Sequence, residues 1–273
     1  AETLERQARA LLEDMQIAAF KVGGSGSVEN VLAVAESVSD YPDIPLILDP
    51  VLASGRGDEF SGEEIISAMR EMLLPQTTLL TPNAPEARRL AESDEDEGEP
   101  AIDVCAQRLI EMGAQYVLIT GTHENTPQVV NTLYGKSGIV RTDSWARLPG
   151  SYHGSGCTLA SAIATGLAQG LAIEAAVDRA REYVQRAIAS APGIGGGHGQ
   201  PPRTSMTPLP VRVRRTVINS IGDVCAIRKS ISTRPSRWPT TLLGGGTTTS
   251  KSTIAPRSSN WVITVPKATR TWA

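Results

Sequence analysis

The sequence predicts an α/β protein with a mainly parallel sheet and helices on both of its faces. Short apolar segments alternate with longer segments in which apolar residues recur at helical spacing, and this alternation is typical of parallel sheets. Glycine and polar residues follow the ends of the apolar segments, where open α/β sheets bind their ligands. Both observations hold for residues 1–200, after which the composition changes.

The strands expected in the first 120 residues are short and apolar, and each leads into a turn or a helix. Residues 17–22 precede the glycine-rich turn at 23–27, and residues 45–48 lead into Asp49. Further strands are expected at 78–81 and 116–120, with helices at 3–15, 28–37, 63–74, 82–91 and 101–113.

A hairpin and two helices are expected next. The turn Gly135-Lys-Ser137 separates strand-like segments at 129–134 and 138–141, and residues 145–148 resemble one more short strand. The helices are expected at 158–171 and 173–191, separated at Gly170.

Charge divides the 273-residue chain into two parts. Residues 1–200 carry a net charge of −14 and residues 201–273 a net charge of +11, although the whole chain is close to neutral at −3. The overall balance therefore gives no preference for nucleic acid or membrane, but the division predicts a domain at 1–200 and a separate basic tail.

The tail at 201–273 has few features of a packed domain. Of its 73 residues, 22 are Ser or Thr and 8 are Pro, and only 211–218 and 261–265 resemble strands. Such a composition buries too little apolar surface to offset the entropy lost on ordering. We expect this tail to be largely irregular, and its composition also resembles an out-of-frame reading.

Cysteine usage and hydropathy indicate a reducing, cytoplasmic setting. Cys105, Cys157 and Cys225 are odd in number and widely spaced, which argues against a disulfide framework or a zinc cluster. No apolar run approaches the roughly 18–20 residues of a membrane span. The acidic amphipathic start of the chain resembles neither a signal peptide nor a transit peptide.

The most informative segment is Gly150-Ser-Tyr-His-Gly-Ser-Gly-Cys-Thr-Leu159, a glycine-rich turn directly before the helix expected at 158–171. A helix N-terminus presents unpaired N–H groups and the positive end of the helix dipole, and glycine lets an anion approach the backbone. Cys157 adds a thiol that can act as a general base or nucleophile. In isolation such a cysteine is more often a small buried residue.

Oxygen ligands follow two of the expected strands. Asp49 ends one strand, while Asn83 and Glu86 lie one helical turn apart after Pro82. These groups suit Mg²⁺ carrying phosphates. Taken alone, Asp49 could equally be a turn residue. The spacing of Asn83 and Glu86, taken alone, is more typical of a helix start with an acidic first turn.

Thr120 and Gly121 end a further buried strand, where they could line a nucleotide pocket. His123 and His153 lie nearby in sequence, and both have structural alternatives as loop residues. Together, an anion-binding turn, strand-end carboxylates and a base are what phosphoryl transfer requires. Because the chain has no Gly-x4-Gly-Lys-Ser/Thr P-loop, another type of kinase is predicted.

Four motifs carry a resemblance to a known family: Leu48-Asp-Pro-Val51, Leu80-Thr-Pro-Asn-x-x-Glu-Ala87, His153-Gly-Ser-Gly-Cys-Thr-Leu159 and Gly195-Gly-Gly-His-Gly199. In order and spacing they resemble the hydroxymethylpyrimidine/phosphomethylpyrimidine kinases of thiamine biosynthesis, in the ribokinase-like superfamily. The resemblance covers residues 1–200. It implies a ribokinase-like fold that phosphorylates 4-amino-5-hydroxymethyl-2-methylpyrimidine and its monophosphate with ATP and Mg²⁺.

The resemblance also assigns roles at the helix entry. Cys157 is the implied base that deprotonates the hydroxymethyl group, and the amides of Gly154, Ser155, Gly156 and Cys157 form the implied anion hole. Sugar kinases of the superfamily usually carry Asp at position 157, so Cys favours the vitamin-kinase branch, which includes some pyridoxal kinases.

The remaining implied roles concern ATP and Mg²⁺. Asp49, Asn83 and Glu86 would organise the metal ion and the phosphates, with Asp49 and Glu86 as its carboxylate ligands. Thr120 and Gly121 would border ATP. This segment departs from the Lys-Gly-Gly-His often found there, so one expected cation is absent.

A second departure is at the front of the chain. Ala1 matches a helix well inside a typical family member, so we expect the first strands and much of the pyrimidine pocket to be absent and the sheet to keep an unpaired edge.

Two alternatives to the pyrimidine kinase remain open. One is a pyridoxal kinase of the same superfamily. The other is an inactive kinase-like binding protein whose basic tail contacts nucleic acid or acidic partners. The preferred reading is an enzyme with a small-molecule substrate, no membrane or nucleic-acid partner, and a homodimer as a possible assembly.

Overall fold

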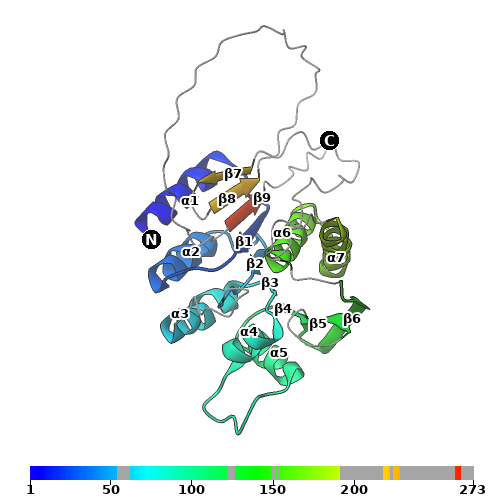
Figure 1. Ribbon diagram of the computed structural model, residues 1–273. Coiled ribbons are helices and arrows are strands. Elements are labelled where there is room, and N and C mark those ends of the chain that lie inside the picture. Colours follow the sequence, from blue (N-terminus) through cyan, green and yellow to red (C-terminus); the bar gives the residue numbers. More distant parts are fainter. Residues whose placement is uncertain are drawn as a thin grey trace, which may run out of the picture.

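The computed structural model describes residues 1–53, 62–121, 127–148, 152, 154–190, 218–221, 224–227 and 262–265. It is an α/β fold in which helices cover both faces of one sheet (Figure 1). The predicted fold class is therefore confirmed. No helix among the described residues is long and apolar enough to cross a membrane.

Four parallel strands in chain order form the centre of the sheet: β1 (Ala19–Val22), β2 (Leu46–Leu48), β3 (Leu79–Leu80) and β4 (Tyr116–Thr120). Beyond β4 the sheet continues with the antiparallel strands β5 (Gln128–Gly135) and β6 (Gly138–Ala146). The separate strand predicted at 145–148 is wrong, because β6 runs without interruption to Ala146, which pairs with Gln128.

Three short strands from the tail lie on the other side of β1. β9 (Val262–Val265) pairs antiparallel with β1, followed by β8 (Val224–Ile227) and β7 (Ile218–Ile221). The expectation of an unpaired edge beside β1 is therefore wrong for this structure. The rest of the tail, including most of the strand predicted at 211–218, lies outside the described residues, so the division of the chain at residue 200 stays a prediction.

Seven α-helices are described, and their order follows the alternation expected from the sequence. They are α1 (Glu2–Asp14), α2 (Val28–Ser39), α3 (Glu63–Ala68), α4 (Ala84–Ala91), α5 (Ile102–Glu111), α6 (Ser155–Ala168) and α7 (Ile173–Ala189).

The helix predicted at 63–74 is interrupted in the structure. After α3 the backbone passes through a π turn (Met69–Leu73) and a 3₁₀ turn (Leu74–Gln76). Pro75 lies at the start of the 3₁₀ turn, and its ring nitrogen cannot donate the hydrogen bond that a continued α-helix needs. The α-helix therefore ends before the predicted boundary.

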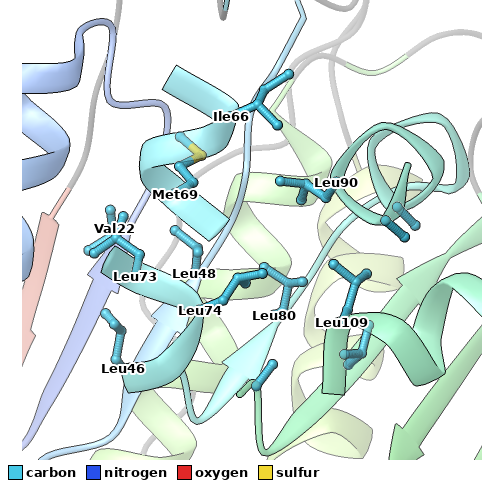
Figure 2. Packing of buried hydrophobic residues seen from close by; sticks show 14 of the residues in the cluster. Val22, Leu46, Leu48, Ile66, Met69, Leu73, Leu74, Leu80, Leu90 and Leu109 are labelled. Carbon is cyan, nitrogen blue, oxygen red and sulfur yellow. The ribbon is translucent and has the colours of Figure 1, made fainter. Parts of the chain in front are cut away.

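Successive residues of the strands face opposite sides of the sheet, and each side has its own core. Leu46, Leu48 and Leu80 pack in the cluster that α2 to α5 cover, shown in Figure 2 with Leu90 and Leu109 of the helices. The residues between and beside them face α6 and α7: Ile47, Leu79 and Leu118. This alternation decides which strand-end side chains lie beneath α6.

Candidate active site

The N-terminus of α6 begins three residues earlier than predicted, at Ser155. Its N-cap, Gly154, has φ +84°, a left-handed conformation that glycine adopts without a Cβ penalty, and no side chain caps the helix. Ser155, Gly156 and Cys157 are therefore the first three helical residues. Their N–H groups have no acceptor within the helix and lie at the positive end of its dipole, as an anion hole requires.

Beneath this helix, the ends of β1 and β2 place a lysine next to a carboxylate. Ala19 and Ile47 pack against the small side chains of Ala160 and Ala164 in α6. Lys21 follows Ala19 by two residues and Asp49 follows Ile47 by two residues. Both side chains therefore lie on the side of the sheet that faces α6. The Lys21 Nζ donates to Asp49 Oδ2 at 3.0 Å, and both residues are buried.

The backbone fixes Asp49 at this place. Its N–H donates to the Val22 carbonyl at 2.8 Å, which extends the β1–β2 pairing by one residue. In the same way the Thr81 N–H donates to the Leu48 carbonyl at 2.9 Å. Asp49 and Thr81 thus continue the backbone pairing of the sheet beyond the strand ends.

Cys157 lies close to Asp49 and is held in its neutral form. Burial raises the pKa of the Cys157 thiol to about 12, and the negative charge of Asp49 and a side-chain hydrogen bond with it act in the same direction. Lys21 opposes this shift. The helix dipole alone would favour the thiolate, so in this environment burial and the carboxylate outweigh it.

Asn83 and Glu86 cap α4 by a reciprocal pair of hydrogen bonds. The Glu86 N–H donates to Asn83 Oδ1 at 2.9 Å, and the Asn83 N–H donates to Glu86 Oε2 at 2.9 Å. The second carboxylate oxygen of Glu86 accepts from the Leu52 N–H at 3.4 Å. The pair therefore has the helix-start role that its spacing first indicated, in addition to any role in binding.

Glu86 also lies near enough to Asp49 for the two charges to interact. Burial raises the pKa of Glu86 to about 7, and the negative charge of Asp49 adds to the rise, while the hydrogen bonds from Asn83 and Leu52 oppose it. Asp49, Glu86 and Cys157 thus form one electrostatically coupled group. Four of the residues predicted separately from sequence, these three and Asn83, come together here.

Thr120 and Gly121 lie at the end of β4, next to the start of α4. The Thr120 N–H donates to the Pro82 carbonyl at 2.9 Å, and residues 83 and 120 form an isolated bridge. Gly121 donates its N–H to Asn131 Oδ1 of β5 at 3.1 Å. A Cβ at Gly121 would overlap the Val130 carbonyl oxygen, so the close approach of β5 already requires glycine.

Sequence reasoning missed Lys21 and Asn131. Lys21 is the single charged residue in an apolar strand, and only Val22 separates it from a glycine-rich turn; that combination is a usable signal for a buried functional cation. Asn131 gave no signal, because its partner Gly121 becomes a neighbour only through the β4–β5 pairing. His123, His153 and the motif at 195–199 lie outside the described residues.

The carboxylates fit a metal ion that brings most of its own ligands. Within the described part of the chain, no group of three or more His, Cys, Asp or Glu residues could hold a metal ion. Mg²⁺ usually keeps several waters and binds through one or two carboxylates together with substrate phosphates. The coupled pair of Asp49 and Glu86 supplies that number of hard oxygen donors.

Comparison with known proteins agrees with this geometry. The family described as phosphomethylpyrimidine kinase matches residues 1–202. The chain belongs to this family. The helix-entry motif and the strand-end carboxylates all lie inside the matched range.

Two relatives show how much of each protein the similarity covers. The hydroxymethylpyrimidine/phosphomethylpyrimidine kinase of Bacillus subtilis is 32% identical over 202 residues, with 72% of this chain and 73% of the relative covered. The thiamine biosynthesis bifunctional protein of Geobacter sulfurreducens is 35% identical over 193 residues, which cover 71% of this chain. The match spans only 39% of the bifunctional protein's own length.

A solved structure shows the same ribokinase-like fold. The pyridoxal kinase of Bacillus subtilis in complex with ADP superimposes with a TM-score of 0.61 and 26% identity, covering 73% of this chain and 74% of that protein. This chain thus shares its architecture with an enzyme that binds an adenine nucleotide.

Proposed function

We propose that this chain transfers the γ-phosphoryl group of ATP to 4-amino-5-hydroxymethyl-2-methylpyrimidine and then to its monophosphate. Membership of the phosphomethylpyrimidine kinase family and the names of the relatives support this activity. One structural observation carries it: the first turn of α6, which no side chain caps, contains Cys157, and this thiol lies near enough to the strand-end carboxylate of Asp49 to interact with it. Phosphoryl transfer needs these groups together.

The residues predicted from sequence take the following places in this proposal. The amides of Gly154, Ser155, Gly156 and Cys157 hold the charge that develops on the transferred phosphoryl group. A preorganised helix N-terminus does this without moving during the reaction. Thr120 and Gly121 border the nucleotide from the end of β4.

The carboxylates of Asp49 and Glu86 would hold Mg²⁺ carried by ATP, and Asn83 holds Glu86 in place through the cap of α4. When bound, Mg²⁺ would neutralise part of the phosphate charge. The raised pKa of Glu86, about 7, means that the carboxylate must lose a proton near neutral pH before it can act as a ligand.

Cys157 accepts the proton of the substrate hydroxyl. Because its thiol is protonated in the ligand-free protein, Cys157 first releases that proton to solvent, and the thiolate then takes the hydroxyl proton. The substrate oxygen then forms a bond to the γ-phosphorus, the bond from that phosphorus to the bridging oxygen breaks, and ADP leaves.

The test is phosphorylation of the pyrimidine alcohol by the full chain, with ATP and Mg²⁺, for wild type and Cys157→Ala. We expect turnover in the wild type and a loss of roughly a hundredfold or more in the variant. Cys105→Ala is the matched control, because Cys105 is buried in the core cluster on the α2 to α5 side of the sheet. Unchanged turnover in Cys157→Ala would refute the assignment of the base.

A pyridoxal kinase is the second candidate, supported by the structural likeness to the Bacillus subtilis enzyme. Competition between the pyrimidine alcohol and pyridoxal at equal concentration separates the two. We expect phosphorylated pyrimidine as the main product, and a main product of pyridoxal phosphate would favour the second candidate. A cytoplasmic location and a homodimer also stay predictions.

A further inference from the structure

Lys21 is a fully buried cation at the centre of the site, and neither the motifs nor the proposed mechanism gives it a role. Its side chain has no solvent exposure, and its ammonium group lies 3.0 Å from Asp49 Oδ2. Its strand β1 is otherwise apolar, with every residue buried. A lysine in such a strand needs a specific reason, because a buried charge loses its hydration.

Stability alone is a poor reason for this ion pair. Burying two charges costs several kcal/mol per ion, and replacement of such a pair by apolar residues is often neutral or stabilising. Ala19, which precedes Lys21 on the same side of β1, shows that this part of the sheet accepts an apolar residue against α6. The pair is therefore better explained by what Asp49 has to do.

Asp49 interacts with three groups at once. Lys21 binds one of its oxygens, Cys157 shares a hydrogen bond with it, and Glu86 interacts with it through charge. Without Lys21, Asp49 and Glu86 would be two partly buried acids with no described cation between them. Two negative charges at this separation repel each other, and an Asp49 side chain turned away from the site could no longer serve as an oxygen ligand.

We propose that Lys21 is a positioning residue that holds the Asp49 carboxylate in a fixed orientation for the metal–nucleotide complex. The proposal rests on the proposed function, because it assigns Asp49 to the metal ion carried by the nucleotide. A buried lysine can affect nucleotide binding in two distinguishable ways. A lysine that acts on phosphate directly attracts a nucleotide with or without a metal ion, whereas a lysine that acts through Asp49 matters only when the metal ion is present.

The experiment is a double-mutant cycle on the full chain with Lys21→Met, Asp49→Asn and the combined variant. Isothermal titration calorimetry measures the affinity for ADP with Mg²⁺ and for ADP in EDTA, and urea unfolding at the same pH measures stability. Lys136→Met, at the exposed turn between β5 and β6, is the matched control for loss of a lysine charge.

We expect Lys21→Met to weaken binding of Mg·ADP by about tenfold or more, the effect of one unit charge removed at close range. Binding of ADP in EDTA should change much less, and Lys136→Met should bind both as the wild type does. In the Asp49→Asn background, Lys21→Met should have little further effect on Mg·ADP, since its route of action is already lost.

Two results would overturn the proposal: an unchanged affinity of Lys21→Met for Mg·ADP, or an equal loss in the Asp49→Asn background. If Lys21→Met alone does not fold, the combined variant, which leaves no unpaired charge, is compared with Asp49→Asn. Equal affinities support the proposal, and a further loss in the combined variant contradicts it.

Failure of the proposed function gives a different pattern. A wild-type chain that binds Mg·ADP but phosphorylates no pyrimidine refutes that function, while the binding cycle still decides the role of Lys21. A wild-type chain that does not bind Mg·ADP overturns both.

Discussion

Glu86 and Asn83 cap the same helix for each other, each side chain accepting a hydrogen bond at 2.9 Å from the backbone N–H of the other. The two residues that were predicted as metal-organising groups therefore also have the spacing of a capping box. The two roles are compatible, because capping fixes both side chains at the carboxyl end of β3, close to Asp49. Structural and chemical effects of a substitution here must be measured separately.

Asn83→Ala should lower the free energy of unfolding by about 1 kcal/mol, the usual effect of losing a helix N-cap. Urea unfolding measures it. Asn83→Ser is the matched control, because serine keeps an acceptor for the Glu86 N–H and should stay close to wild type. Equal stability of all three proteins would show that the cap contributes nothing.

Glu86 should make stability depend on pH. Burial raises its pKa from 4.5 in the unfolded chain to about 7 in the folded protein, so the folded state binds the proton more tightly. The resulting stabilisation is fully present below about pH 4.5 and is lost as the pH rises to about 7. Relative to Glu86→Gln, the wild type should lose about 2 kcal/mol between pH 5 and pH 8.

The measurement is urea unfolding of both proteins at the two pH values in the absence of nucleotide. Glu36→Gln, at an exposed position of α2, controls for the loss of one acidic residue. A difference between wild type and Glu86→Gln that stays constant with pH would contradict the raised pKa.

Much of this fold could be predicted because its signals are local. Apolar segments of the right length identified β1 to β4, and the polar residue after each one marked the edge where Asp49 and Thr120 now lie. Errors arose where local signals are weak. The start of α6 was predicted at residue 158 but lies at Ser155. The prediction missed it because the N-cap is a glycine in the left-handed conformation instead of the usual Ser, Thr, Asp or Asn, and because Gly156 has low helix propensity.

The parts of the site that sequence could not predict depend on long-range contacts. The partner of Lys21 is 28 residues away, and nothing near either residue indicates the other. Gly121 was interpreted as a nucleotide-pocket residue, yet the closeness of Val130 in β5 already explains it. Of the tail strands, β9 corresponds to the segment at 261–265 that resembled a strand, but its pairing with β1 had no signal in the sequence. The strand β8 was not predicted, because it lies in a segment with a composition typical of irregular chain.

Gly154 and Gly156 should respond differently to alanine, although a Cβ at either position would meet no other atom within 4 Å. Gly154 has φ +84°, which alanine adopts at a cost of about 1 kcal/mol, so Gly154→Ala should be destabilised or should shift the start of α6. Gly156 is helical, and Gly156→Ala should be neutral or more stable by up to about 1 kcal/mol. Thermal unfolding distinguishes them.

The two variants also report on the anion hole. Gly154→Ala should weaken binding of phosphate-containing ligands more than Gly156→Ala, because it disturbs the direction of the first amides. Equal stability and equal ligand affinity in both variants would show that the left-handed turn has no role.

The Cys157 thiol should react slowly with iodoacetamide in the ligand-free protein. Its pKa of about 12, caused first by burial and then by Asp49, leaves very little thiolate at pH 8. Because the thiolate is the reactive form, alkylation should be about a hundredfold or more slower than for an ordinary thiol.

Mass spectrometry of the peptide that contains Cys157 measures the rate, and the same peptide in urea-unfolded protein is the control. Asp49→Asn should accelerate the reaction, since it removes a negative charge that disfavours the thiolate. A fast reaction in the folded wild type would mean that the helix dipole outweighs burial, and Cys157 would then already be a thiolate in the ligand-free protein.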